Sequence, residues 1–293
     1  MRSAAAILLV GALATGARAG ETPVCHVYAS PAVRVGTVPA PLLEMSGLAT
    51  SRRHPGVYWS QNDSGNPFEI YAIRPDGSIV ARFPLRGGDN VDCEDIAVGP
   101  CRSDPKGSCV YLADIGDNLE LRPRVAIYEI PEPERLVEQT LQARRLAYRY
   151  PDRPHNAEAL LVDPHAGTLY VVTKELETLG TLFRLDDLAF GKVGRAVRIR
   201  TLRAPSGFGA LATAGAVHPS GRRILLRTYS HVWEYRGRAG DPIETLLATT
   251  PVGVPSATQP QGEAVTYTSD GLGYLLGTEK AGSPLYRVDC ATP

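Results

Sequence analysis

Short apolar segments separated by turns recur along the whole chain. The stretch "AEALLVDPHAGTLYVVTKE" at 157–175 shows the unit, in which the apolar segments 160–162 and 169–172 flank the turn sequence "DPHAG". Apolar, β-branched runs of this length bounded by Pro, Gly and Asp are typical of β-strands. Charged residues stand at the ends of the unit, at Glu158, Lys174 and Glu175. Because a lone buried charge is costly, we expect these ends to face water, one another or a ligand.

The same unit occurs five times. It first appears as "EMSGLATSRRHPGVYWSQNDSG" from residue 44, and it returns from residues 94, 158, 213 and 263, at intervals of 50 to 64 residues. Further strand-like segments, such as "FEIYAI" at 68–73 and "ARFPL" at 81–85, bring each repeat to about four strands. Repeats of roughly 40–50 residues with four strands each are the signature of β-propeller blades. We therefore predict an all-β propeller of five four-stranded blades.

The two ends of the chain together supply one further repeat. Only 31 residues remain from Glu263 to the C-terminus, and "VRVGTV" at 33–38 has the pattern of a strand. The N-terminal strand is therefore predicted to complete the last blade, which removes the open edges of the ring. Six blades are the alternative and would require a repeat that the sequence does not show. The stretch "ERLVEQTLQ" at 134–142 has a helical pattern, and we interpret it as an insertion in the long second repeat.

The first 19 residues, "MRSAAAILLVGALATGARA", have the features of a secretory signal peptide. An Arg precedes a short apolar run, and "ARA" precedes the expected cleavage after Ala19. The apolar run is too short to span a membrane, and no later segment is long enough. We expect an exported monomer, periplasmic or extracellular, whose residues 20–293 form a single domain.

Export permits disulfides, and the chain has five cysteines. Cys25 and Cys290 lie in the two halves of the shared blade and are predicted to pair. Cys101 and Cys109 bracket the turn "RSDPKGS" and are predicted to pair as well. Cys93 is then the free thiol, with a Cys93–Cys101 bond as the alternative. No Cys-x-x-Cys motif occurs, which argues against a zinc site.

The charge pattern and the motifs exclude several classes of function. The chain has 31 basic and 31 acidic residues without a basic run, so nucleic acid is not expected as a partner. No G-x-S-x-G motif occurs, so a serine hydrolase has no support.

The propeller prediction gathers the polar ends of the repeats at one mouth of the central channel. In a propeller the first strand of each blade lines the channel and the second runs antiparallel beside it, so the start of the first and the end of the second share a rim. The candidate ligand-binding residues at this rim are Glu44, Asn62, Asp63, Glu94, Asp114, Glu158, Glu263 and Lys280. Lys174, Arg227 and Lys280 partly offset the carboxylates and are candidates for holding a negative group.

Two interpretations of the repeated carboxylates remain open. Crowded carboxylates repel one another unless they share a cation or a proton, and several oxygen ligands suit Ca²⁺ better than zinc. The Ca²⁺ ligands would then be Glu44, Glu94, Glu158 and Glu263. In the alternative, these residues accept backbone N–H bonds from a neighbouring blade and hold the blades together. His155, three residues before Glu158, is a candidate general base.

The first two repeats, "EMSGLATSRRHPGVYWSQNDSG" and "DCEDIAVGP" with "VYLADIGDN", resemble secreted bacterial propellers of the phytase-like ("esterase-like activity of phytase") group. "AEALLVDP" with "LYVVTK" and "HPSGRRILLRTY" resemble the same proteins, so the likeness covers most of residues 44–280. The resemblance implies a propeller fold and is less specific for an activity.

Three functional hypotheses follow. The first is an exported propeller that binds a small ligand or Ca²⁺ at the polar mouth. The second is a metal-dependent hydrolase of phosphate esters or lactones, in which Lys174, Arg227 or Lys280 holds negative charge and His155 is the base. The third is a scaffold that binds a partner protein, with a purely structural rim.

Overall fold

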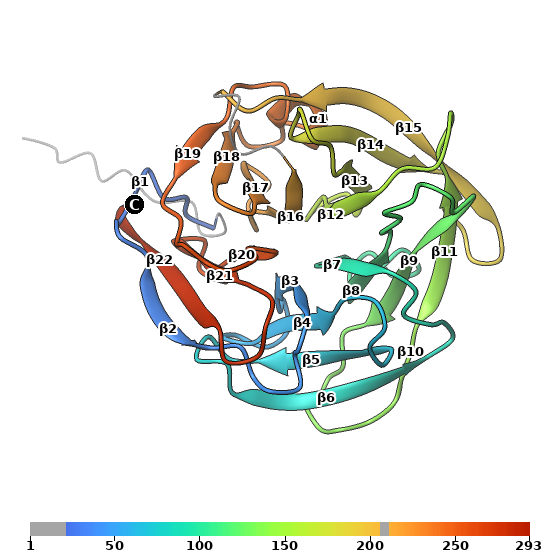
Figure 1. The fold of residues 1–293 in the computed structure, drawn as a ribbon, viewed down its shortest axis with the longest axis horizontal. Helices are drawn as coiled ribbons and strands as arrows, with labels where there is room; N and C mark the ends of the chain where they lie inside the picture. Colours follow the sequence, from blue (N-terminus) through green and yellow to red (C-terminus); the bar gives the residue numbers. More distant parts are fainter. Residues whose placement is uncertain (1–21, 206–210) are drawn as a thin grey trace, which may run out of the picture.

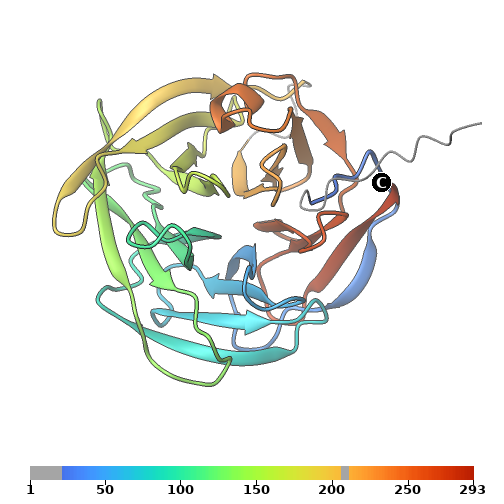
Figure 2. The same ribbon diagram turned by 180° about the vertical axis from the view of Figure 1, so that it is seen from behind.

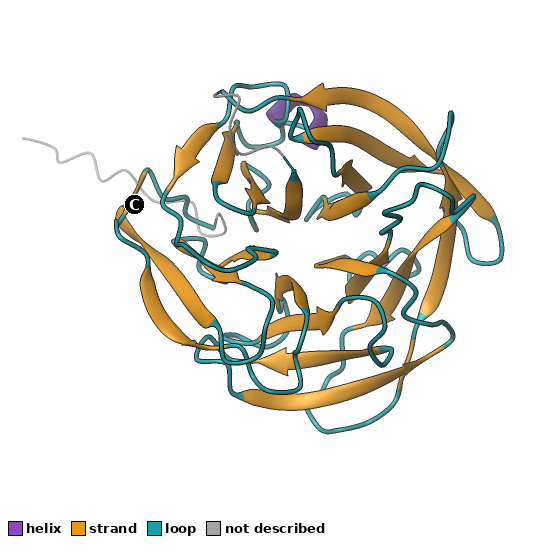
Figure 3. Ribbon diagram, viewed as in Figure 1, coloured by secondary structure: helices purple, strands orange, loops and turns teal. Residues whose placement is uncertain are grey.

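Five groups of β-strands, here called blades 1 to 5, are arranged around a common centre, as two opposite views of the molecule show (Figure 1, Figure 2). The computed structural model describes residues 22–205 and 211–293, so the predicted signal peptide lies outside the described residues. Nearly all regular structure in these residues is β-strand, and the helix α1 (Ile243–Leu246) is a single turn (Figure 3). The predicted all-β propeller of five blades is confirmed.

Each blade consists mainly of strands that follow one another in the sequence and pair antiparallel. Blade 1 contains β3 (Met45–Thr50), β4 (Tyr58–Asn62), β5 (Glu69–Ile73) and β6 (Ile79–Arg86). Blade 2 contains β7 (Cys93–Pro100), β8 (Ser108–Asp114), β9 (Val125–Pro131) and β11 (Arg144–Arg149). Blade 3 contains β12 (Ala157–Val162), β13 (Leu169–Thr173), β14 (Gly180–Asp186) and β15 (Val193–Leu202). Blade 4 contains β16 (Ala212–Val217), β17 (Arg223–Thr228), β18 (Val232–Arg236) and β19 (Val252–Val254).

Blade 5 is built from both ends of the chain. It contains β20 (Ala264–Tyr267), β21 (Gly273–Gly277) and β22 (Pro284–Thr292), and β22 pairs with the N-terminal strands β1 (Val27–Tyr28) and β2 (Val33–Thr37). A disulfide joins Cys25 to Cys290 beside this pairing, and a second joins Cys101 to Cys109. The predicted closure and both predicted disulfides are confirmed, and the two bonds fit an exported protein. Cys93 is free and buried, and burial raises the pKa of its thiol well above the ordinary value.

The innermost strands form a closed ring. β3, β7, β12, β16 and β20 contact one another in this order, and β20 contacts β3. Strands near the centre are packed on both faces, so β12 and β13 are buried along their whole length, whereas the outer strand β15 alternates between buried and exposed positions. Five apolar clusters fill the boundaries between successive blades, as Leu161 and Leu226 do between blades 3 and 4.

The predicted helix at 134–142 is wrong. This segment is irregular and ends in β10 (Leu141–Gln142), which pairs parallel with β6 of the preceding blade. Its apolar residues Leu136 and Leu141 cover the cluster between blades 1 and 2. Packing against the neighbouring blade therefore overrides a short helical pattern, which is weak on its own. No helix in the described residues is long and apolar enough to cross a membrane.

Candidate functional site

One extra residue near the start of the inner strands sets the geometry of the channel mouth. In blades 1 to 4 the pairing of the first two strands shifts by one residue, for example between Cys93 and Asp95, which is a β-bulge. The extra residues are Ser46, Glu94, Glu158 and Thr213. Bulges change the direction of a side chain, and here they do so at equivalent places around one rim.

The residues that follow the second strand of each blade occupy equivalent positions at the same rim. Their backbone N–H groups donate across the blade in the same way: Asp63 to Glu44, Ile115 to Asp92, Lys174 to Asn156 and Glu279 to Gln261. Glu263 of blade 5 is therefore equivalent to Glu94 and Glu158. Glu44 is equivalent to Asp92 and not to Glu94. The first repeat therefore begins two residues later than the sequence predicts, and Ser46 occupies the position of the repeated Glu.

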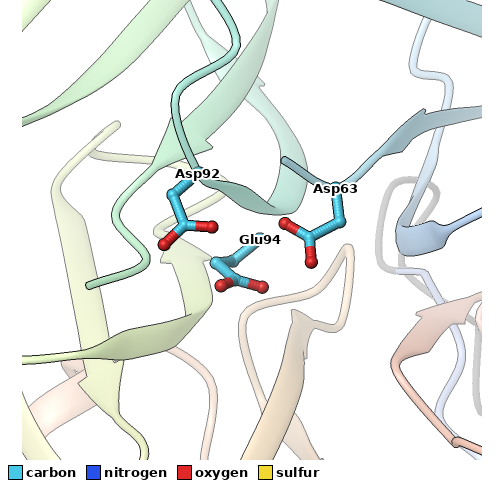
Figure 4. Close-up of side chains that lie close together, drawn as sticks. All are labelled: Asp63, Asp92 and Glu94. Carbon is cyan, nitrogen blue, oxygen red and sulfur yellow. The ribbon is translucent and has the colours of Figure 1, made fainter. Parts of the chain in front are cut away.

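A compact group of three carboxylates lies at this rim. Asp63 follows β4, Asp92 precedes β7, and Glu94 is the second residue of β7. One carboxylate oxygen from each of the three residues lies within 4.8 Å of the other two (Figure 4). Burial raises the pKa of Asp63 to about 6, and it raises the pKa of Asp92. Burial, with the charges of Glu158 and Asp63, holds the pKa of Glu94 well above its ordinary value. Three such groups require a shared proton or a cation.

Gly116 makes room for this group. A Cβ atom at residue 116 would overlap Glu94 Oε1 and the carboxylate of Asp92, and the Gly116 N–H donates to the carbonyl oxygen of Asp92 at 3.1 Å. The segment "DIGDN" at 114–118 is thus the backbone support of the carboxylate group. Asp114 serves the same purpose, because its Oδ1 accepts from the Asp92 N–H at 3.1 Å and from Arg122 Nη2 at 2.7 Å.

The cation of the mouth is Lys174. Its Nζ donates to Glu158 Oε1 at 2.6 Å and to the Tyr229 hydroxyl at 2.7 Å. Burial lowers the pKa of Lys174, but the charge and hydrogen bond of Glu158 outweigh burial, so the net shift is upward. Burial raises the pKa of Glu158 to about 7 against the opposing effect of Lys174.

Glu263 and Glu279 form a pair of carboxyl groups. The two side chains are hydrogen-bonded to each other, and Glu263 Oε1 also accepts from Gln261 Nε2 at 2.9 Å. Burial, the hydrogen bond to Glu263 and its charge raise the pKa of Glu279 to about 8. The pair therefore shares one proton at neutral pH.

The four predicted Ca²⁺ ligands do not form one group. Only Glu94 belongs to the carboxylate group, whereas Glu158 is paired with Lys174 and Glu263 with Glu279. Glu44 is exposed and accepts a hydrogen bond from Asn66. Asp92, which sequence reasoning missed, takes their place. Its signal in the sequence is its position two residues before a repeated Glu.

Two of the three predicted catalytic residues are buried away from this group. His155 packs between Tyr150 and Phe183 in the cluster between blades 2 and 3, and its Nε2 contacts Asp152 at 3.0 Å. Arg227 is 1% exposed and holds blade 5, since its Nη1 donates to the Ala264 carbonyl at 2.8 Å. Burial lowers the pKa of Arg227 to about 9. His155 is enclosed by aromatic rings, and Arg227 donates to the Ala264 carbonyl and to Gln259 Oε1, which corrects the expectation that they act at the mouth.

The remaining predicted ligands are a buried amide and an exposed amine. Asn62 has both side-chain polar atoms in use, since its Oδ1 accepts from the Glu44 N–H and its Nδ2 donates to the Pro41 carbonyl. Lys280 is exposed and has a left-handed backbone conformation with φ of 72°.

The blade-joining role predicted for the repeated Glu residues is performed by Asp95. Its fully buried carboxylate accepts N–H bonds from Leu160 at 2.8 Å and Gly215 at 3.1 Å, in β12 and β16, and from Ile96 at 2.8 Å. One side chain of blade 2 thus reaches the inner strands of blades 3 and 4. The partners of Glu94, Glu158 and Glu263 that the structure gives are side chains.

No protein-family model matches the sequence, and no curated protein matches it. The structure is similar to that of soluble aldose sugar dehydrogenase from Escherichia coli in its apo form, with a TM-score of 0.48 and 10% identity over 88% of this chain and 99% of that one. It is also similar to hydrazine synthase from Kuenenia stuttgartiensis, with a TM-score of 0.46 and 8% identity over 92% of this chain and 98% of that one. Likeness at this level carries no statement about activity, and the resemblance to phytase-like propellers stays a prediction.

Proposed function

We propose that this propeller binds a divalent metal ion, Ca²⁺ by the chemistry of its donors, at the channel mouth. The observation that carries the proposal is the convergence of Asp63, Asp92 and Glu94 within 4.8 Å. All three donors are hard carboxylate oxygens, which Ca²⁺ prefers, and no soft ligand takes part in the group. Gly116 supports the proposal because its missing side chain leaves space that the carboxylates of Asp92 and Glu94 occupy.

Thermal unfolding of residues 20–293 in EDTA and then in Ca²⁺ tests the proposal. At about 100 times its dissociation constant, Ca²⁺ contributes roughly 2.7 kcal/mol, which is a rise in Tm of roughly 5–10 °C for a chain of this size. Glu94→Gln is expected to unfold at a higher temperature than wild type in EDTA, because it removes a repelling charge, and to lose the Ca²⁺ shift. Gly116→Ala, which alters no charge, is expected to lose the shift as well.

Glu44→Gln is the matched control, since it removes a carboxylate of the same mouth outside the group of three. It should keep most of the Ca²⁺ shift. The metal proposal is abandoned if wild type shows no shift at millimolar Ca²⁺, or if Glu44→Gln and Glu94→Gln lose the shift to the same extent.

A second candidate function, hydrolysis of phosphate esters or lactones, is favoured by Lys174. Its ammonium group is held by Glu158 and Tyr229 at the mouth that carries the carboxylate group. It is therefore suited to hold an anionic oxygen of a substrate, while Ca²⁺ bound by the carboxylates would polarise the ester oxygen.

Turnover of p-nitrophenyl phosphate and δ-valerolactone in Ca²⁺ tests this activity. Lys174→Met, Glu94→Gln and Glu158→Gln are each expected to lower turnover at least 100-fold in folded protein. Lys192→Met, which changes an exposed lysine between the outer strands β14 and β15, should leave turnover unchanged. Equal turnover in all four variants would rule out catalysis at this mouth and leave metal binding as the function.

A further inference from the structure

A large cavity lies at the other end of the channel. It has a volume of about 560 Å³ and is formed where all five inner strands end. Its apolar wall includes Leu48, Ile96, Leu160, Val162 and Ala216. Cavities of roughly 300–1,000 Å³ with an apolar wall and a few polar groups are typical of small-molecule sites.

Asp95 lies between this cavity and the carboxylate group along β7. Its neighbour Glu94 is part of the carboxylate group, whereas its neighbour Ile96 lines the cavity. The Asp95 carboxylate is itself occupied by hydrogen bonds from the Leu160 and Gly215 N–H groups. None of the three carboxylates of the proposed metal site lines the cavity, so the cavity is a separate site.

Most polar side chains on the cavity wall already have partners. Thr50 bonds Thr266, Ser51 bonds Glu132, and the Asp270 carboxylate accepts from Thr268 Oγ1 and the Leu272 N–H. His165 Nε2 contacts the Ser220 carbonyl at 3.3 Å. These groups have less need of a ligand, because folding satisfies them.

Arg52 differs from these residues. It lines the cavity and is exposed, and no carboxylate of residues 22–205 or 211–293 lies within ion-pair distance of its guanidinium group. Its neighbour Arg53 has a carboxylate, Glu134, at 3.9 Å and does not line the cavity. An unpaired guanidinium at the edge of an apolar cavity is suited to a carboxylate or similar oxyanion.

We propose that this cavity binds an amphipathic organic anion, whose apolar body lies against the ends of the inner strands and whose carboxylate lies at Arg52. The wall accounts for the apolar part of such a ligand and Arg52 for its charge. The geometry favours a monocarboxylate with a single chain, because Arg52 is the one unpaired cationic side chain on the cavity wall in the described structure.

Isothermal titration calorimetry with straight-chain carboxylates tests the proposal. Decanoate is expected to bind, octanoate to bind about tenfold more weakly, and decyltrimethylammonium not to bind, since each buried methylene changes affinity about three- to fourfold. Arg52→Gln should weaken decanoate about fivefold, as expected for an exposed ion pair, and the matched control Arg53→Gln should not change it.

A second variant locates the bound molecule. Ser269→Trp places a bulky side chain at an exposed position on the cavity wall and should weaken decanoate at least tenfold without altering Tm. Glu94→Gln, at the opposite end of the channel, should bind decanoate as wild type does, so failure of the metal proposal leaves this test intact. The proposal is overturned if decanoate does not bind, if decyltrimethylammonium binds equally well, or if Arg52→Gln and Ser269→Trp are both without effect.

Discussion

Asp95 is the second residue of "EDIAV", directly after a repeated Glu. In the folded chain its carboxylate is fully buried and accepts three backbone N–H bonds from three blades. Burial raises the pKa of Asp95 well above its ordinary value, although the three amide donors oppose this shift. A single side chain thereby joins inner strands that are 65 and 120 residues away in the sequence.

Asp95→Asn is expected to lower the free energy of unfolding by about 1–3 kcal/mol. The amide has the same shape but replaces an acceptor oxygen with a donor, which leaves at least one buried N–H unpaired. Urea denaturation measures the change. Asp89→Asn, at an exposed position near the same strand, should stay within about 0.5 kcal/mol of wild type. A similar loss of unfolding free energy in both variants would contradict a specific stabilising role of the three N–H bonds.

At the scale of elements, the closure of blade 5 can be predicted from the sequence, whereas the bulges cannot. The pairing of β2 with β22 follows from chain length and from the apolar pattern of both ends, and Cys25–Cys290 reinforces it. The bulges have no pattern of their own, because a one-residue shift leaves the apolar spacing of the strand almost unchanged. For this reason the sequence predicts that the first repeat begins at Glu44, although Ser46 is the residue equivalent to Glu94.

The two disulfides should differ in their effect on stability. The Cys25–Cys290 bond closes a loop with a sequence separation of 265 and the Cys101–Cys109 bond one of 8. In the chain-entropy model, the double Ser variant of the first pair loses about 5 kcal/mol and that of the second about 2.5 kcal/mol. Guanidinium denaturation of the two double variants measures both losses. Equal losses would show that closure of blade 5 does not depend on the long-range bond.

Basic and acidic residues balance at 31 each in the whole molecule, but several carboxyl groups gather at one mouth of the channel. Asp63, Glu158 and Glu279 share one mouth, and burial raises their pKa values to about 6, 7 and 8. A carboxyl group with a raised folded-state pKa binds more protons when folded than when unfolded. Stability then falls as pH rises from the unfolded pKa near 4 to the folded pKa.

We therefore expect the metal-free protein to be more stable at pH 5 than at pH 8.5. Tm measured in EDTA across this range should fall steadily as the pH rises. Glu279→Gln should flatten the part of the curve between about pH 6 and 8, because the amide keeps the hydrogen bond to Glu263 without a titrating proton. The exposed Glu177→Gln is the control and should reproduce the wild-type curve. A Tm that rises with pH over this range would contradict the shared proton of Glu263 and Glu279.

The fold of this protein could be predicted from its sequence. Five copies of a strand–turn–strand unit, a short C-terminal remainder and an N-terminal strand permit few arrangements other than a closed five-bladed ring. The closed ring brings Cys25 to Cys290, whereas a Cys93–Cys101 bond stayed open beside Cys101–Cys109 until the structure decided between them. The features that could be predicted depend on chain length and on the spacing of apolar residues, and neither requires knowing which side chains meet.

Which polar groups meet could not be predicted from the sequence. Asp63 joins Glu94 across a blade boundary, whereas Glu158 is taken by Lys174, and sequence equivalence could not distinguish the two Glu residues. His155 stands three residues before a rim residue but packs in a core cluster. The physical reason is that side-chain direction depends on one-residue shifts in pairing and on space left by neighbours such as Gly116, and both arise only when the blades close.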